Sequence, residues 1–202
     1  MSGASVRRVV VATANRGKLA EIRSALDFAG WEFVTAADLG GEPLDVEETG
    51  DTFEANARLK AQAYHQALGL PALADDSGLQ VDALGGEPGV YSSRYAGADA
   101  TDADNNAKLL GALAEVPAEM RTARFRSVIV LIDEDGSETV AVGACEGAIG
   151  YEARGEGGFG YDPLFLPDAV PGRTMAELDL AEKNAISHRG AALRALRAAL
   201  DT

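Results

Sequence analysis

The sequence predicts an α/β domain built on a mixed β-sheet. Apolar β-prone runs alternate with amphipathic helical segments over residues 9–74, and two further β-prone runs follow at 124–133 and 138–146. Alternation of strands and helices favours parallel strand pairs, whereas the turn signal between the last two runs, residues 134–137, predicts an antiparallel hairpin. With 202 residues and 47% hydrophobic content, the chain can bury one sizeable core.

The first half of the chain gives clear element boundaries. A strand is predicted at 9–12, and a helix from Arg16 to about Ala29, because apolar residues recur there at helical spacing and Gly30 follows. Alternating polarity predicts a second strand at 31–35. The acidic stretch 36–50, which contains glycine and proline, predicts a long loop.

A second helix is predicted from Asp51 to about Leu68, with Asp51 as N-cap and Glu54 completing a capping box. An apolar strand at 71–74 then ends in Asp75-Asp76-Ser77-Gly78, and glycines and prolines predict an ordered loop region with short extended pieces over 77–99. Further helices are predicted at 102–114 and 187–200, the latter with Ser187 as N-cap.

Composition excludes several classes of protein. The net charge is −14 and no run of Lys or Arg occurs, which argues against binding to duplex nucleic acid. No segment approaches the roughly 20 apolar residues of a membrane span, and the apolar stretch after Arg7-Arg8 is too short for a signal peptide, so a cytoplasmic protein is expected. The single cysteine, Cys145, lies in an apolar run and is expected to be buried.

A polar turn between the first strand and helix predicts an anion site. The turn reads Thr13-Ala14-Asn15-Arg16-Gly17-Lys18, and the helix after it directs free N–H groups and its positive dipole end towards the same place. Thr13, Asn15 and Lys18 add a hydroxyl, an amide and a cation. The spacing does not match a Walker loop, and a polar connection with a surface lysine is the alternative.

Acidic side chains form the second candidate group. Asp75 and Asp76 follow a buried strand, where side-chain alternation turns only one of them to a given face, and such oxygens suit Mg²⁺ or can take a proton from water. Glu47 is a candidate second metal ligand, and Lys60, on the helix after it, could reach a phosphate. The alternatives are an Asx-turn at the aspartates and solvated surface charge at Glu47 and Lys60.

The third candidate group lies near the C-terminus. Glycines in the run 157–163 allow close approach to a flat ligand, with Phe159 as a stacking face and Asp162 as an acceptor for ring N–H groups. His188 and Arg189 fall in the first turn of the last helix, where cations oppose the helix dipole unless an acceptor-rich ligand lies opposite. An aromatic plug beneath a glycine turn and simple surface charge are the alternatives.

Taken together and in order, four motifs resemble the inosine triphosphate pyrophosphatases, which hydrolyse non-standard purine nucleoside triphosphates. The motifs are Thr13-x-Asn15-x-x-Lys18, the run 74–79 (Ala-Asp-Asp-Ser-Gly-Leu), the run 158–163 (Gly-Phe-Gly-Tyr-Asp-Pro) and Ser187-His188-Arg189. The resemblance spans residues 9 to about 195. It implies a single domain over 1–202 with two lobes, a long mixed sheet flanked by helices and an active-site cleft between the lobes. It also implies a homodimer and Mg²⁺-dependent cleavage between the α and β phosphates.

The resemblance also implies roles for individual residues. Glu47 and Asp76 would bind Mg²⁺, and Asp76 would accept the proton of the attacking water. The substrate would be bound by three groups of residues: Thr13, Ala14, Asn15, Arg16, Gly17 and Lys18 with Lys60 and Ser77; Phe159, Gly160, Tyr161 and Asp162; and Lys183, His188 and Arg189. Two alternatives remain open: a related pyrophosphatase that prefers pyrimidine or modified bases, and a nucleotide-sensing module without turnover.

Overall fold

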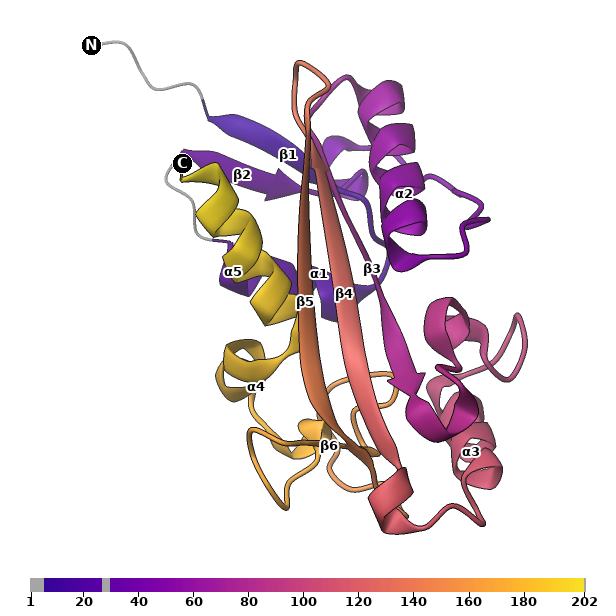
Figure 1. The fold of residues 1–202 in the computed structure, drawn as a ribbon. Coiled ribbons are helices and arrows are strands. Elements are labelled where there is room, and N and C mark those ends of the chain that lie inside the picture. Colours follow the sequence, from indigo (N-terminus) through magenta and orange to yellow (C-terminus); the bar gives the residue numbers. More distant parts are fainter. Residues whose placement is uncertain (1–5, 27–29, 202) are drawn as a thin grey trace. The chain divides into compact units, whose positions relative to one another are not determined.

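The computed structural model describes residues 6–26 and 30–201. Within them, six strands form one mixed sheet in the order β2-β1-β3-β4-β5-β6 (Figure 1). The bounds are β1 Arg7–Val11, β2 Trp31–Val34, β3 Ala72–Val81, β4 Thr122–Ile132, β5 Glu138–Ile149 and β6 Phe165–Pro167. β1 pairs in parallel with β2 and β3, whereas β5 and β6 are antiparallel. The predicted α/β class with a mixed sheet is confirmed.

Five α-helices occur in the described part of the chain: α1 Arg16–Ala25, α2 Phe53–Leu68, α3 Asp102–Ala112, α4 Leu180–Ile186 and α5 His188–Leu200. Among these described residues, no helix has both the length and the apolar character that a membrane crossing needs. The chain divides into two compact units. Unit 1 comprises Met1–Asp76, Val128–Val142 and Ala192–Thr202, and unit 2 comprises Ser77–Ser127 and Gly143–Ala191. The predicted cleft between two lobes stays a prediction.

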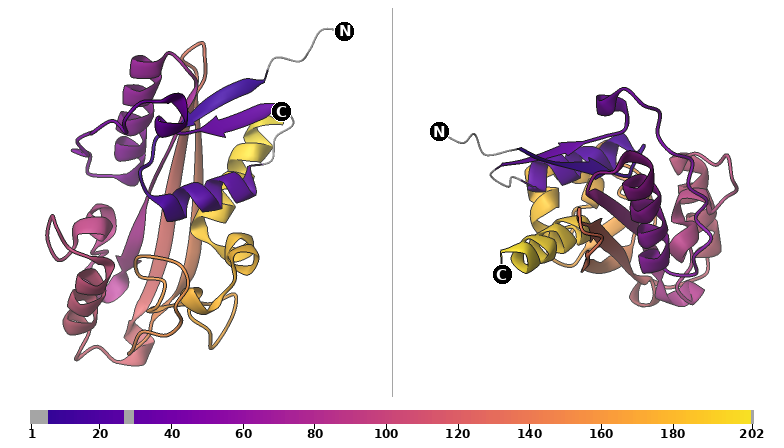
Figure 2. Two further views of the ribbon diagram at one scale, coloured as in Figure 1. Left: turned by 180° about the vertical axis from the view of Figure 1, so that it is seen from behind. Right: turned by 90° about the horizontal axis from the view of Figure 1, so that it is seen from above.

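Unit 1 has a core on each face of its strands. Side chains alternate between the two faces of a strand, so odd and even positions separate here. One core joins α1 and α5 to the strand residues Val9, Val11, Leu73, Ile129, Leu131 and Ala141. The other joins α2 to Val10, Ala12, Val34, Ala72, Ala74, Val130 and Ile132. Helices α1 and α5 therefore cover one face and α2 the other (Figures 1 and 2).

Unit 2 is organised around a core of its own. Leu109 and Leu113 are fully buried there, and the rings of Phe125 and Phe165 lie 4.7 Å apart between centroids. Cys145 is buried in the same core, as the sequence predicts. Burial raises the pKa of its thiol from 9.0 to about 11, so Cys145 is a packing residue rather than a nucleophile.

The sequence reasoning was wrong about the length of β3. The strand was expected to end near residue 74 and continues to Val81, through both aspartates. The polar run 75–78 has the composition of a turn, but the structure supplies partners for Asp75 and Asp76 and buries Leu79 and Val81 completely. Tertiary contacts therefore overrode the local turn signal.

Other boundaries also differ from the predictions. Helix α1 ends at Ala25, while residues 27–29 of the predicted helix lie outside the described residues. The N-cap of α2 is Thr52 and not Asp51: its Oγ1 accepts the N–H of Ala55 at 3.1 Å. Both residues are good caps, and the backbone decides which one is used. Strand β6 and helix α4 were not predicted, nor were the five 3₁₀ turns of the described residues: Ala37–Leu39, Asp82–Leu84, Gly89–Arg94, Ala118–Met120 and Met175–Glu177.

The corrected cap of α2 leads to a stability prediction. Thr52→Ala should lower the free energy of unfolding by about 1 kcal/mol, because one N–H at the start of α2 loses its acceptor. Asp51→Ala is the matched control and should change it by less than about 0.5 kcal/mol. Urea unfolding followed by circular dichroism measures both. A larger loss in Asp51→Ala than in Thr52→Ala would contradict the assigned cap.

Candidate functional site

The predicted polar turn joins β1 to α1. Asn15 caps α1, its Oδ1 accepting the backbone N–H of Lys18 at 3.0 Å. The Oγ1 of Thr13 accepts the backbone N–H of Asn15 at 3.1 Å. Thr13 and Asn15 therefore shape the turn, while the Lys18 side chain extends beyond it. The Arg16 side chain, also a predicted contact, lies outside the described part of the structure.

Two adjacent aspartates of β3 contact lysines from different helices. Asp75 shares the odd-numbered face that packs on α1, and its Oδ2 lies 2.9 Å from Nζ of Lys18 on that helix. Asp76 shares the even-numbered face that packs on α2, and its Oδ1 lies 2.9 Å from Nζ of Lys60 on α2. The expectation that alternation separates the two carboxylates is confirmed.

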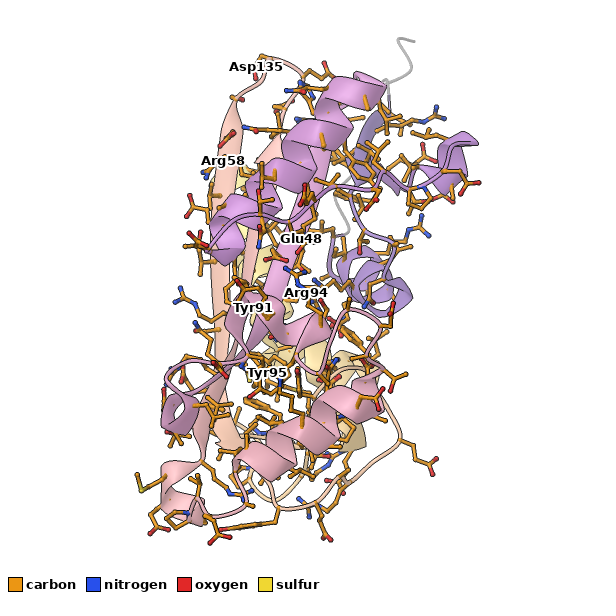
Figure 3. All side chains as sticks on the ribbon, turned by 90° about the vertical axis from the view of Figure 1, so that its right-hand side faces the viewer. Glu48, Arg58, Tyr91, Arg94, Tyr95 and Asp135 are labelled. Carbon is orange, nitrogen blue, oxygen red and sulfur yellow. The ribbon has the colours of Figure 1, made fainter. Side chains whose placement is uncertain are left out.

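Lys60 also contacts a glutamate from the acidic loop before α2. Its Nζ lies 2.9 Å from Oε1 of Glu48, which is labelled beside α2 in Figure 3. Glu47, the residue selected from the sequence, is exposed, whereas Glu48 is half-buried. Sequence reasoning missed Glu48 because nothing in the composition distinguishes two adjacent glutamates. Only the course of the loop decides which side chain turns towards α2.

Burial and charge set the protonation of this cluster. Burial raises the pKa of Asp76, and the ammonium groups of Lys60 and Lys18 offset only part of that effect. Burial disfavours the Lys60 ammonium, but the carboxylates of Asp76 and Glu48 outweigh it and raise the pKa of Lys60. Lys60 therefore stays a cation, while Asp76 has an increased affinity for a proton.

One oxygen of Asp76 is available for chemistry. Its Oδ1 is occupied by Lys60, whereas Oδ2 is buried and receives no hydrogen bond from the described residues. A buried acceptor without a donor is unfavourable unless a ligand supplies one. The described residues contain no group of three or more His, Cys, Asp or Glu side chains arranged as a metal site. The oxygen donors of Asp76 and Glu48 nonetheless fit a hard divalent cation that keeps several waters.

A second cluster, in unit 2, is centred on Asp162. Its Oδ2 accepts the backbone N–H of Phe159 at 2.9 Å and lies 2.6 Å from Nζ of Lys183. Asp162 and Lys183 are both buried. Gly158 has φ +74°, and a Cβ on it would lie 2.1 Å from Asp162 Oδ2, so only glycine fits. The carboxylate is thus engaged within the protein, and its contact with a base stays a prediction.

Two cations lie close to the half-buried ring of Phe159. Nζ of Lys183 is 4.5 Å from the ring centroid, and Cζ of Arg189 is 5.7 Å from it. Arg189 also donates from Nη2 to Oγ of Ser77 at 2.8 Å. The structure therefore brings together four residues predicted from distant parts of the sequence. Their aromatic face and donors suit a flat, oxygen-bearing ring.

Two other predicted residues are mainly held by protein contacts. Tyr161 is buried and donates its hydroxyl to the carbonyl oxygen of Ser92 at 2.8 Å, and burial raises the pKa of its hydroxyl. The imidazole of His188 stacks on Phe125, with ring centroids 4.8 Å apart and an interplanar angle of 14°. Ser187 accepts the N–H of Gly190 at 3.0 Å, consistent with the predicted capping role.

Comparison with known protein families shows to which family the chain belongs. The model of the Ham1 family matches residues 9–199, which run from β1 to α5 and include both clusters. The chain belongs to the Ham1 family. The resemblance inferred from the four motifs is therefore confirmed, because curated relatives of this Ham1 chain are named dITP/XTP pyrophosphatases.

Two of those relatives cover nearly the whole Ham1 chain. A protein of Geobacter sulfurreducens is 53% identical over 190 residues, covering 94% of each chain. One of Symbiobacterium thermophilum is 52% identical over 189 residues, covering 94% of this chain and 92% of its own. A solved HAM1 protein from Coxiella burnetii is 46% identical with a TM-score of 0.85, covering 96% of this chain and 98% of its own.

Because Asp75 and Asp76 lie on opposite faces of β3, they should differ in their energetic coupling to Lys60. In double-mutant cycles on the free energy of unfolding, Lys60→Met and Asp76→Asn should couple by about 1–3 kcal/mol, because the side chains touch. The matched control is the cycle of Lys60→Met with Asp75→Asn, because Asp75 is also buried but lies on the opposite face. Its coupling should stay below about 0.5 kcal/mol. Equal coupling in the two cycles would contradict the assignment.

Proposed function

We propose that this chain hydrolyses non-standard purine nucleoside triphosphates, namely ITP, dITP and XTP, to the nucleoside monophosphate and pyrophosphate. Membership of the Ham1 family and relatives named dITP/XTP pyrophosphatases support this activity. The single structural observation that carries it is the Asp76 carboxylate, with one oxygen held by Lys60 and the other without a partner among the described residues. Such a group can take a proton from water beside a phosphate.

For the triphosphate, we propose the turn 13–18 and two lysines. The start of α1 offers the positive end of the helix dipole and backbone N–H groups, including that of Gly17, and the turn before the helix adds the N–H of Ala14. Lys18 and Lys60 add cations, whose present partners are carboxylates that a phosphate chain can replace. Phosphoryl transfer needs mainly positioning and neutralisation of charge, which these groups supply.

In the proposed hydrolysis, Asp76 accepts a proton from the attacking water. The water oxygen bonds to the α phosphorus, and the bond from that phosphorus to the bridging oxygen breaks, which releases pyrophosphate. The raised pKa of Asp76 strengthens it as a base. Mg²⁺, held by Asp76 with Glu48 or Glu47, would neutralise charge on the phosphate oxygens.

For the base, we propose stacking on Phe159 with donors around the ring. Arg189 and Lys183 lie beside Phe159 and carry donors that suit the oxygen at position 6 of hypoxanthine and xanthine. Adenine carries an amino donor at that position, so donor would face donor. A site of this kind can reject the wrong base by about 10⁴-fold. Ser77, Gly160, Tyr161, Asp162 and His188 complete the proposed base-side set.

We further propose that the protein works as a cytoplasmic homodimer with small nucleotides as its only partners. The acidic net charge of −14 supports the exclusion of nucleic acid and of anionic membrane surfaces.

Product analysis tests the activity. With Mg²⁺, purified protein should release pyrophosphate from ITP and XTP much faster than from ATP or UTP. Asp76→Asn should lower kcat by about 10²–10⁴-fold, because the proton acceptor is lost. Lys18→Ala should also reduce turnover, while both variants stay folded by circular dichroism. Faster cleavage of UTP would favour a pyrimidine-directed relative, and tight binding without product would favour a sensing module.

A matched pair of glutamates tests the metal site. Glu48→Gln should raise the Mg²⁺ concentration needed for half-maximal activity by about tenfold or more, and weaken Mn²⁺ binding measured by electron paramagnetic resonance. Glu47→Gln should stay within about twofold of wild type, because Glu47 is exposed while Glu48 contacts Lys60. The reverse ranking would assign the metal to Glu47, as the sequence suggests.

A further inference from the structure

We propose that Asp102 and Asn106 of α3 are positioning residues that hold the Phe159–Gly160 turn in the conformation that binds the purine base. This inference rests on the proposed function, because it assigns the stacking of the base to Phe159. Neither residue belongs to the four motifs, and the hydrogen bonds that they make to this turn are to the backbone of Gly160. They act through the backbone groups that they bind.

The two side chains clamp Gly160 on both sides of its peptide backbone. The N–H of Gly160 donates to Oδ2 of Asp102 at 2.7 Å. The carbonyl oxygen of Gly160 accepts from Nδ2 of Asn106 at 2.9 Å. Asp102 and Asn106 are four residues apart on α3 and therefore share one face of the helix. Two side chains from one turn of α3 thus bind both the N–H and the carbonyl oxygen of Gly160.

The rest of the turn is closed by its own residues. The N–H of Phe159 donates to Asp162 Oδ2 at 2.9 Å, and the carbonyl oxygen of Phe159 accepts the N–H of Asp162 at 3.3 Å. Gly160 has φ +61°, and glycine populates many backbone conformations at little cost. The internal bonds leave both polar groups of Gly160 unheld, and α3 supplies their partners. The clamp therefore restricts the residue that is freest to move.

Helix α3 is well suited to act as a fixed reference. Leu109 and Leu113 anchor its C-terminal end in the unit 2 core. Asn105 accepts the N–H of Ala96 at 2.8 Å and donates to the carbonyl oxygen of Ser93 at 3.2 Å, which binds α3 to the segment that carries Tyr95 in Figure 3. A helix held by both apolar and polar contacts can transmit its position to Gly160.

Loss of the clamp should act on base binding rather than on the chemical step. Phe159 lies between Gly158 and Gly160, so movement of Gly160 shifts its ring relative to Lys183 and Arg189. The residues that we propose for the phosphate chain and for proton transfer belong to unit 1, whereas α3 and the Phe159–Gly160 turn belong to unit 2. The expected signature is therefore a raised KM for ITP with kcat nearly unchanged.

Steady-state kinetics with ITP and Mg²⁺ test the clamp. Asp102→Ala and Asn106→Ala should each raise KM about tenfold, the effect of losing a hydrogen bond to a carboxylate or amide, and change kcat by less than about threefold. Asp102→Asn keeps an acceptor oxygen and should restore most of the loss. Asp104→Ala is the matched control, because Asp104 lies in the same helical turn but completes the capping box with Thr101. It should leave KM within about twofold of wild type.

A second background tests whether the clamp works through Phe159. In Phe159→Ala enzyme, Asp102→Ala should have no further effect on KM, because the ring that it positions is gone. A tenfold effect that persists in this background would overturn the proposal. So would a KM in Asp104→Ala that rises as much as in Asp102→Ala, since helix stability would then explain both.

Hydrogen exchange separates failure of the clamp from failure of the proposed function. In Asp102→Ala, the amide of Gly160 should exchange at least tenfold faster than in wild type, whether or not the protein turns over ITP. Unchanged exchange in an active enzyme would overturn the clamp alone. A wild-type protein that releases no pyrophosphate from ITP would overturn the proposed function, and with it the assignment of the clamp to base binding.

Discussion

The alternation of side chains along β3 is the constraint on which the phosphate-side cluster depends. Two adjacent aspartates must face opposite sides of the sheet, and each meets a lysine from the helix that covers its side. Because α1 packs on the odd face and α2 on the even face, Lys18 and Lys60 approach the same short segment from two directions. A shift of β3 by one residue would exchange both pairs and bury the wrong side chains.

Placing these charges inside the protein has an energetic cost that the ion pairs offset only in part. Burial raises the pKa of Asp76 in spite of two nearby ammonium groups, while two carboxylates keep Lys60 charged. A cluster tuned for stability alone would not leave Oδ2 of Asp76 without a donor among the described residues. The incomplete pairing is understandable if a substrate and a cation complete it, which links the electrostatics to the proposed hydrolysis.

The base-side cluster uses its charges differently. The carboxylate of Asp162 is fully engaged by Lys183 and by the N–H of Phe159, so it organises the turn beneath the ring. Gly158 is needed for close approach, because a Cβ at this position would collide with that carboxylate. Rigidity then has to come from outside, and α3 provides it at Gly160. Preorganisation of this kind lowers the cost of ordering a site when a ligand binds.

Local patterns were enough to predict the α/β class, the strand–turn–helix at residues 9–18 and the hairpin turn, because each depends on short-range spacing and turn chemistry. The four motifs are likewise short stretches that can be recognised in the sequence itself. They misjudged β3 and the cap of α2, since a polar run such as 75–78 is a turn by composition and a strand only with its partners in place. The choice of Glu48 over Glu47 as the partner of Lys60, and the contact of α3 with Gly160, lay beyond local patterns. The first depends on the course of the loop before α2, and the second on which distant segments meet. Gly160 is 58 residues from Asp102 in sequence, and folding alone brings them within hydrogen-bond distance.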